Sequence, residues 1–296
     1  MTDRITFYKG HGLGNDYLAL ELAALPFTLS PPGVRLLCDR HTGVGSDGIL
    51  GRVPSSVADF GVRIFNPDGS EAEKSGNGLR IFAAYLLERG EAEVGRPFTV
   101  ETPGGVVQLL IVEQTAEGVL QVEAEMGTAS FRSADVGLAG PDREVENEAL
   151  ELESGDVVAI NTVSTGNPHC VVFQDELDVE ELRRRAPQIC AHPSFARGTN
   201  VQFAVSAGPA ALDAWVWERG AGETSASGSS ACAVAAAAVR RGMASERQVE
   251  VRMPGGSLYV HVRDDWSLLL RGPVEGVCRG ELTAGMLARL RGLAWP

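Results

Sequence analysis

The stretches SEAEKSGNGLRIFAAYLLERG (70–90) and GETSASGSSACAVAAAAVRRG (222–242) align without a gap at a shift of 152 residues. This shift superposes identical residues, namely Glu71 on Glu223, Ser75 on Ser227, Gly76 on Gly228, Arg89 on Arg241 and Gly90 on Gly242. Two shorter blocks follow the same order, Gly-Asn at 14–15 on 166–167 and, at a shift of 151, Pro-Gly-Gly at 103–105 on 254–256. Matched blocks in one order predict an internal duplication.

The repeat predicts the fold class. We expect α+β architecture in two pseudo-symmetric lobes, residues 1–135 and 136–296, with the last strand or helix able to cross over. Alternating segments such as GVRIFN and NVQFAV predict strands, so each lobe should be a curved, mostly antiparallel sheet. One apolar helix follows each serine turn and ends before a C′ glycine, Gly90 or Gly242. AVAAAAV (233–239) is apolar on every face, which predicts a central helix wrapped by its sheet. The acidic stretch 133–155 joins the lobes or forms an excursion.

The two serine turns predict an anion site. If pseudo-two-fold symmetry relates the lobes, the N-termini of the central helices face one another across an active-site cleft between them. Unpaired N–H groups and the positive ends of two helix dipoles would then converge on one point. Either turn alone would be interpreted as a helix cap. Two turns at matched positions favour a site for an anion, most simply a carboxylate.

Composition argues against several classes of function. The net charge of −13 disfavours a nucleic-acid partner. No apolar run reaches the roughly 18 residues of a membrane span, and MTDRITFYKG has no signal-peptide core, so we expect no membrane partner and a cytoplasmic protein. Five scattered cysteines without a CxxC pair indicate reduced thiols. Without a ligand cluster or a nucleotide fingerprint, we expect no metal and no organic cofactor. A homodimer is left open.

Lysine is nearly absent from the chain. Among 26 basic residues only Lys9 and Lys74 are lysines, and both lie in glycine-rich stretches. An ammonium is a compact, titratable point charge, so a functional role is one interpretation, and two ordinary surface lysines are the other.

Other polar residues suit an amino-acid ligand. Paired groups on opposite sides of one carbon are what a two-base isomerase requires. Glu218 and Arg219 form a charge pair able to grip an ammonium and a carboxylate, although a surface ion pair is the alternative. Asparagines in turn-like stretches could hold the polar ends of an amino acid, but asparagine is also a common turn residue. They are Asn15, Asn66, Asn167 and Asn200.

Six ordered motifs resemble the diaminopimelate epimerase family of cofactor-independent amino-acid racemases and epimerases. They are FYKGHGLGND, RHTGVGSDG, NPDGSEAEKSGNGLR, TGNPHCVVF, HPSFARGTNVQF and WERGAGETSASGSSACA. The resemblance implies the duplicated fold and isomerisation at an amino-acid α-carbon without pyridoxal phosphate, as between L,L- and meso-diaminopimelate in lysine biosynthesis. Its substrate-gripping positions fall on Asn15, Asn66, Asn167, Asn200, Glu218 and Arg219. Its carboxylate-holding loops fall on Gly76, Asn77, Gly228 and Ser229. His169, in the GNPH motif, is implied to be structural.

The sequence departs from the family at the catalytic positions. The family has a cysteine at the opening of each glycine turn, where this chain has Ser75 and Ser227. A serine hydroxyl is far less acidic than a thiol and needs an adjacent base. Cys170 and Cys232 occupy neither turn and become candidates only if the geometry differs.

Three explanations of the serines stay open: a laboratory substitution of both cysteines, a natural branch in which Lys74 or another group supplies the base, or a binding protein that lost the reaction. A desolvated lysine beside a carboxylate pocket can serve as a base. On extended backbone, however, Lys74 and Ser75 point opposite ways.

Overall fold

The structure, a computed structural model, describes residues 4–294 and divides the chain into two compact units. The first unit runs to Ala124 and resumes at Gly272, and the second is Glu125–Arg271. The chain passes from one unit to the other within strands β8 (Leu120–Thr128) and β17 (Ser267–Glu281). Across residues 4–294, no helix has the length and apolar character that a membrane span needs.

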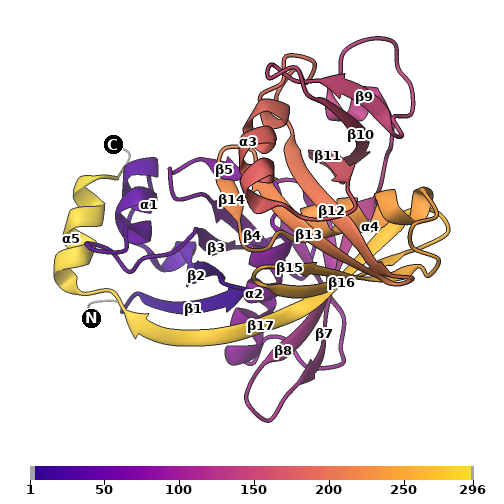
Figure 1. The fold of residues 1–296 in the computed structure, drawn as a ribbon. Helices are drawn as coiled ribbons and strands as arrows, with labels where there is room; N and C mark the ends of the chain where they lie inside the picture. Colours follow the sequence, from indigo (N-terminus) through magenta and orange to yellow (C-terminus); the bar gives the residue numbers. More distant parts are fainter. Residues whose placement is uncertain (1–3, 295–296) are drawn as a thin grey trace. The chain divides into compact units, whose positions relative to one another are not determined.

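Strands of the first unit surround its central helix (Figure 1). Besides parts of β8 and β17, this unit contains β1 (Thr6–Gly12), β2 (Asn15–Glu21), β3 (Ile49–Val53), β4 (Phe60–Phe65), β5 (Glu71–Ala72), β6 (Phe98–Thr102), β7 (Gly105–Gln114), α1 (Pro31–Cys38), α2 (Gly76–Glu88), α5 (Ala284–Gly292) and the 3-10 turn η1 (Leu22–Ala24). Pairing runs β1–β2–β3–β4–β6–β7–β8–β17 and returns to β1, which makes a closed eight-stranded barrel. The pairs β2–β3 and β4–β6 are parallel, whereas β1–β2, β3–β4, β6–β7, β7–β8 and β1–β17 are antiparallel.

The second unit repeats this succession of pairings. It contains β9 (Glu148–Glu151), β10 (Val157–Ser164), β11 (Pro168–Phe173), β12 (Asn200–Gly208), β13 (Ala211–Glu218), β14 (Gly222–Thr224), β15 (Gln248–Met253), β16 (Gly256–Val262), α3 (Val179–Cys190), α4 (Gly228–Arg240) and the 3-10 turn η2 (Ser133–Val136). The pairs β11–β12 and β13–β15 are parallel, as β2–β3 and β4–β6 are in the first unit. The pairs β10–β11, β12–β13, β15–β16 and β16–β17 are antiparallel. The sequence repeat is therefore also a repeat of structure.

The central helices α2 and α4 begin and end as the sequence predicts. Ser75 and Ser227 are their N-cap residues, both in extended backbone conformation, and each helix has 13 residues. Gly90 and Gly242 follow the C-caps with φ of 70° and 66°, the left-handed conformation that glycine adopts at no steric cost. In each case the glycine N–H and the next N–H donate back into the last helical turn. The C′ glycines are thus confirmed.

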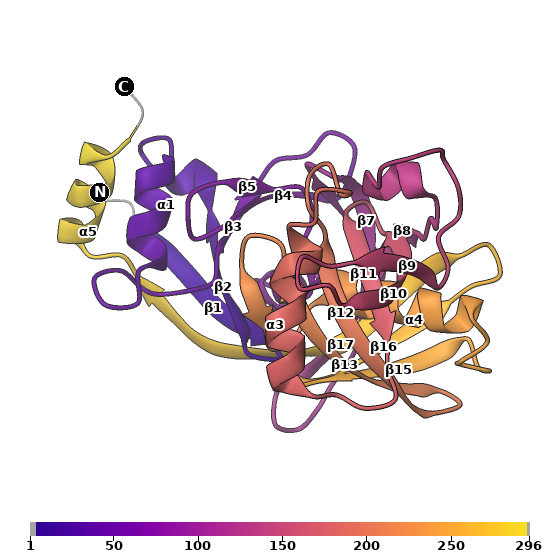
Figure 2. The ribbon, with the colours of Figure 1, turned by 45° about the horizontal axis from the view of Figure 1, so that its top comes forward.

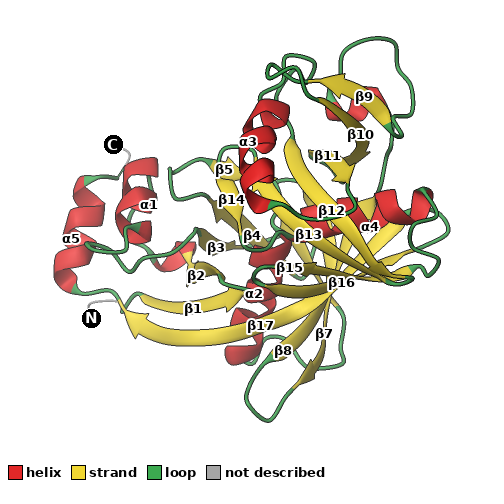
Figure 3. Ribbon diagram, viewed as in Figure 1, coloured by secondary structure: helices red, strands yellow, loops and turns green. Residues whose placement is uncertain are grey.

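Both central helices are enclosed by strands of their own unit (Figure 3). In α2 every residue from Gly76 to Leu86 is buried, and the helix contacts β1, β2 and β7. In α4 the alanine run 235–238 is buried, and the helix contacts β10 to β13, β15 and β16. Alanine suits this position because a small side chain lets strands approach on every face of the helix.

Three further helices were not expected. α1 begins at the N-cap Ser30, followed by proline at the first helical position, and α3 begins at the N-cap Asp178. These capping signals are legible in the sequence. α5 lies beside α1 (Figure 2), where Leu290 and Val34 share one apolar cluster. The stretch 133–155 is an excursion of the second unit, because its apolar residues join that unit's core.

Candidate active site

The residues singled out in the sequence fall into two groups, one in each unit. The N-terminal half-site comprises Asn15, Asn66, Lys74, Ser75, Gly76 and Asn77, and the C-terminal half-site comprises Asn167, Asn200, Glu218, Arg219, Ser227, Gly228 and Ser229. In each group, the first backbone N–H groups of the buried helix that follows the serine have no partner within that helix. Each half-site therefore offers an anion the positive end of a helix.

The hydroxyl of Ser75 caps its own helix. Its Oγ accepts a hydrogen bond from the Gly78 N–H at 3.0 Å and lies 3.3 Å from the Tyr17 hydroxyl. Tyr17, on β2, is buried. Lys74, the residue before the cap, is half-buried. The hydroxyl of Ser75 is therefore placed by two groups, neither of which is a carboxylate.

Asn15 and Asn77 are joined to each other and to charged groups at either end. Asn77 Nδ2 donates to Asn15 Oδ1 at 3.2 Å, and Asn15 Nδ2 donates to Asp47 Oδ2 at 3.1 Å. On the other side, Arg80 Nη2 donates to Asn77 Oδ1 at 2.7 Å. Arg80 is fully buried one turn into α2, where its guanidinium adds positive charge beneath the helix start. Asn66 differs from this pair, because it is half-buried and its Nδ2 donates to Ser70 Oγ at 2.9 Å within its own turn.

Lys9 belongs to a network of charges beside this half-site. Its ammonium lies 3.0 Å from the Asp16 carboxylate and donates to the Gly45 carbonyl at 2.7 Å. Arg40 also donates to Asp16, at 2.7 and 3.2 Å, and to Asp47 at 2.7 Å. Burial would raise the pKa of Asp16, but the bonds from Arg40 and Lys9 outweigh it and lower the pKa to about 2. Lys9 therefore holds the loop that carries Gly45 against β2.

The depressed pKa of Asp16 makes stability depend on acid. Its folded-state pKa of about 2 lies below the ordinary value of about 3.9, so ionised Asp16 favours the folded state by roughly 2 kcal/mol. This contribution is complete above about pH 5 and is lost as the pH falls towards 2. We expect denaturant titrations to give a smaller free energy of unfolding at pH 3 than at pH 7, and a weaker pH dependence for Asp16→Asn. An unchanged pH dependence in the variant would contradict this account.

The C-terminal half-site pairs its serine with a carboxylate. The Ser227 hydroxyl makes no capping bond to its own helix and lies near the side chain of Glu218, the last residue of β13, close enough to act on the pKa of that carboxyl group. Burial raises the pKa of Glu218 above its ordinary range, and the nearby Ser227 hydroxyl opposes that rise only in part. A carboxyl group with a raised pKa is a stronger base when ionised and a usable acid when protonated.

Asn200 and Arg219 hold the turn that carries Glu218. Asn200 is buried, its Nδ2 donates to the Pro168 carbonyl at 3.0 Å, and its Oδ1 accepts from the Arg219 N–H at 2.9 Å. The guanidinium of Arg219 is exposed and donates to the Arg197 carbonyl at 2.8 Å. Asn200 thus links the end of β13 to the start of β11, and Arg219 presents a cation beside Glu218.

His169 is buried and neutral. Its Nε2 lies 3.0 Å from Asn167 Oδ1, an acceptor, so Nε2 carries the proton. Its Nδ1 accepts from Gln202 Nε2 at 3.1 Å. Burial lowers the pKa of His169 to about 3, which keeps the ring uncharged at neutral pH. Thr165 Oγ1 also donates to Asn167 Oδ1, at 3.0 Å, so two donors hold this amide.

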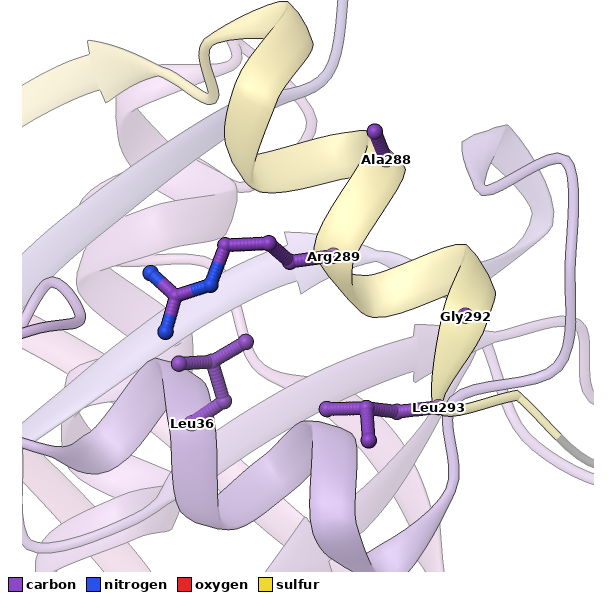
Figure 4. Close-up of a pocket in the computed structure, with 5 residues that line it drawn as sticks. All are labelled: Leu36, Ala288, Arg289, Gly292 and Leu293. Carbon is purple, nitrogen blue, oxygen red and sulfur yellow. The ribbon is translucent and has the colours of Figure 1, made fainter.

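The cysteines near the second turn do not replace the missing thiols. Cys170 is fully buried on β11, and burial raises the pKa of its thiol, which disfavours the thiolate. Cys232 is fully buried inside α4, one turn beyond Ser227. The hollow between α1 and α5 contains no half-site residue either (Figure 4). It is lined by Leu36, Ala288, Arg289, Gly292 and Leu293.

The repeat is symmetric in backbone but not in chemistry. At the shift of 152, Glu218 corresponds to Asn66, Lys74 to Ala226 and Arg80 to Cys232. The turn at Ser227 therefore has the carboxyl group of Glu218 near its serine, whereas the turn at Ser75 has the buried guanidinium of Arg80 beneath it. Sequence reasoning missed Tyr17 and Asp47. The same shift places Tyr17 on His169, a signal that could have drawn attention to it.

Comparison with known proteins gives matches over nearly the whole chain. The family model described as diaminopimelate epimerase matches residues 7–132 and 161–277. Diaminopimelate epimerase 2 of Nostoc sp. is 42% identical over 283 residues, 95% of this chain and 97% of that protein. Diaminopimelate epimerase of Pelotomaculum thermopropionicum is 41% identical, over 93% and 98% of the two chains. A solved hydroxyproline epimerase from Agrobacterium vitis aligns with a TM-score of 0.69 over 95% of this chain and 92% of that one, at 14% identity, which supports the fold alone.

Proposed function

The chain belongs to the diaminopimelate epimerase family, and from this premise we propose that it is an amino-acid epimerase that interconverts L,L- and meso-diaminopimelate. The family consists of isomerases that act on amino acids. The curated relatives are named for diaminopimelate, and that substrate has the second zwitterionic end that the polar residues of the C-terminal half-site suit.

The position of the Glu218 carboxyl group near the Ser227 hydroxyl carries this proposal. A serine hydroxyl becomes useful in proton transfer when an adjacent base can take its proton. We propose that Ser227 Oγ accepts the substrate α-proton while the Ser227 hydroxyl proton passes to the Glu218 carboxylate. The proximity of the two groups and the raised pKa of Glu218 support this role, because they place a strong carboxylate base near the serine.

The opposite face of the α-carbon must receive a proton in the same reaction. We assign this step to Ser75, whose hydroxyl would donate its proton to the carbanion. The Lys74 ammonium would return a proton to Ser75 through solvent, since adjacent side chains on extended backbone point opposite ways. In the reverse direction the two serines exchange roles. Two-base transfer at one carbon requires that both half-sites reach the same substrate, as in the cleft expected between pseudo-symmetric lobes. Each unit supplies one serine at the N-cap of its buried central helix, so each half-site offers one such hydroxyl.

Binding of the substrate would use the two helix starts and the polar side chains near them. The α-carboxylate would accept from backbone N–H groups at Gly76, Asn77, Gly228 and Ser229. The α-ammonium would lie beside Glu218 and the distal carboxylate would pair with Arg219. The amides that would frame the polar ends of the substrate are Asn15, Asn66, Asn167 and Asn200. The burial of both helix starts supports the α-carboxylate assignment, because a buried anion site binds in a low dielectric.

The direct test follows the α-proton by NMR. The protein is incubated with L,L- or meso-diaminopimelate in deuterated water. We expect loss of the α-proton signal and conversion between the two isomers, with deuterium in the product. Absence of exchange at high protein concentration, together with measurable binding, would overturn the epimerase proposal.

The role of Lys74 has its own prediction. If Lys74 resupplies the proton of Ser75, Lys74→Met should slow isomerisation about tenfold or more at saturating substrate, whereas Lys74→Arg should retain binding but not full rate. Lys9→Met is no suitable control, because it removes the partner of Asp16. Ser245→Ala, in a turn of the second unit, serves instead. A Lys74→Met rate equal to wild type would remove Lys74 from the mechanism.

The presence of serine at both catalytic positions favours a second candidate, an amino-acid-binding protein without isomerase activity. It retains the same binding residues and predicts diaminopimelate binding by calorimetry with no α-proton exchange. The exchange experiment therefore separates the two candidates.

A further inference from the structure

A chain of directional hydrogen bonds crosses the N-terminal half-site. It runs from Arg80 to Asn77, from Asn77 to Asn15 and from Asn15 to Asp47, with donor–acceptor distances of 2.7, 3.2 and 3.1 Å. All four side chains lie in the first unit. This series of hydrogen bonds ends at Asp47, which the sequence motifs did not assign to the substrate.

The charged groups at the two ends, Arg80 and Asp47, fix the direction of all three hydrogen bonds. A guanidinium only donates and a carboxylate only accepts. Arg80 must therefore face the oxygen of the Asn77 amide, which turns the Asn77 nitrogen towards Asn15. Asp47 must face the nitrogen of the Asn15 amide, which turns the Asn15 oxygen towards Asn77. Each amide thus has one orientation compatible with its charged neighbour.

Asp47 is itself held in place. Its Oδ1 accepts from Arg40 at 2.7 Å and its Oδ2 accepts from the Asp16 N–H at 3.1 Å. Its own N–H donates to Asp16, to the backbone oxygen at 2.8 Å and to Oδ1 at 3.1 Å. The carboxylate is half-exposed, but its position is set by β2 and the loop that follows α1.

We propose that Asp47 is a positioning residue for the carboxylate-binding turn, acting through Asn15 on Asn77. Asn77 occupies the first turn of α2, so anchoring its side chain on both sides fixes the backbone N–H groups on either side of it. With the opposite amide orientation, Asn15 would turn an oxygen towards Asp47 and a nitrogen towards Asn77 Nδ2. Both contacts would then be repulsive, and the turn would lose its tether. This inference rests on the proposed function, which assigns a substrate carboxylate to the turn.

The matched asparagine of the other half-site is held differently. Asn167 corresponds to Asn15, but its oxygen accepts from Thr165 and His169, both uncharged. Thr199 stands at the position that corresponds to Asp47. The carboxylate tether is therefore a property of the first unit and not of the repeat.

The test uses Asp47→Asn, which keeps the shape of the side chain but gives it a donor. We expect the KM for diaminopimelate to rise roughly fivefold with kcat changed less than about twofold, the size expected for one hydrogen bond to a half-exposed carboxylate. Asp39→Asn is the control, because Asp39 lies in the same loop and accepts from residues 41 and 42 without touching Asn15. Asp39→Asn should leave KM within twofold of wild type.

A double-mutant cycle separates positioning from a general loss of stability. If Asp47 acts through Asn15, the change from Asn15→Ala to Asn15→Ala/Asp47→Asn should leave KM unchanged, although Asp47→Asn alone raises it. Additive changes in KM, or an unchanged KM for Asp47→Asn, would overturn the inference. Absence of binding and exchange in the wild-type protein would instead overturn the proposed function, so the two failures are distinguishable.

Discussion

Replacing Glu218 by glutamine is expected to slow exchange of the diaminopimelate α-proton by about 100-fold or more at saturating substrate. General acid–base groups contribute about 10²- to 10⁴-fold, and glutamine cannot take the proton of Ser227. The position of Glu218 near Ser227 and its raised pKa single out this carboxylate. Saturating substrate matters, because Glu218 is also proposed to bind an ammonium and the substitution should weaken binding as well.

The matched control for this variant is Glu223→Gln. Glu223 lies on β14, beside Glu218 in the same hairpin, but pairs with Arg183 at 2.8 Å and accepts from Trp215 Nε1 at 3.0 Å. Its replacement should change stability modestly and leave the exchange rate nearly unaffected. Ser227→Ala and Glu218→Gln should each cost about as much as the double variant, since the two residues act as one unit. Fully additive effects would show that they act separately.

The rate should also depend on pH through Glu218. Because its pKa is raised, the carboxylate form needed to accept a proton accumulates only above a pH higher than an ordinary glutamate requires. In the direction in which the C-terminal half-site acts as base, exchange should rise with pH through that raised pKa and then level off. Glu218→Gln should abolish this rise. An identical pH profile in the variant would assign the titration to another group.

Restoring cysteine at both serine positions is expected to raise the exchange rate about 100-fold at pH 8. A thiol has a pKa of about 8.5, and the N-terminus of a helix lowers it, so a useful fraction becomes thiolate without an alkoxide having to form. The backbone needs no change, because both serines already occupy the N-cap position with nearly equal φ, −140° and −144°.

Single variants and alkylation provide the controls for the double substitution. Each single variant should gain much less than the pair, since two-base transfer needs an acid and a base together. Alkylation by iodoacetamide should remove the gain in exchange rate. Wild-type protein treated in the same way controls for alkylation of the exposed thiol of Cys278. If the double variant folds and binds diaminopimelate yet gains no exchange, the two half-sites do not act on one α-carbon and the epimerase proposal fails.

Much of the fold is predictable from the sequence because the same helix-start and helix-end signals occur in both copies of the repeat. The turns at Ser75 and Ser227 and the glycines at 90 and 242 mark the same helix boundaries independently, and the structure confirms all four. The helices α1, α3 and α5 were missed because each lies outside the matched blocks. Their starts are marked only by caps such as Ser30 and Asp178, which are common in other turns too.

Side-chain partners in the half-sites were less predictable. The motifs indicate Glu218 and Ser227 as separate residues, but not that the carboxylate meets the hydroxyl, because nine positions and a turn separate them. Likewise nothing in NPDGSEAEKSGNGLR indicates that Asn77 is tethered through Asn15 to Asp47, which lies on a different loop.

The sequence by itself determined the duplication, the two buried helices and the serine that opens each of them. These features depend on helix capping, glycine conformation and apolar periodicity, which are determined by residues close together in the sequence. Only the tertiary structure decided that the two serines differ, with the Ser75 hydroxyl capping its helix and the Ser227 hydroxyl lying near Glu218. Hydrogen bonds act over about 3 Å and in fixed directions, so partners distant in the chain are set by the packing of strands around α2 and α4.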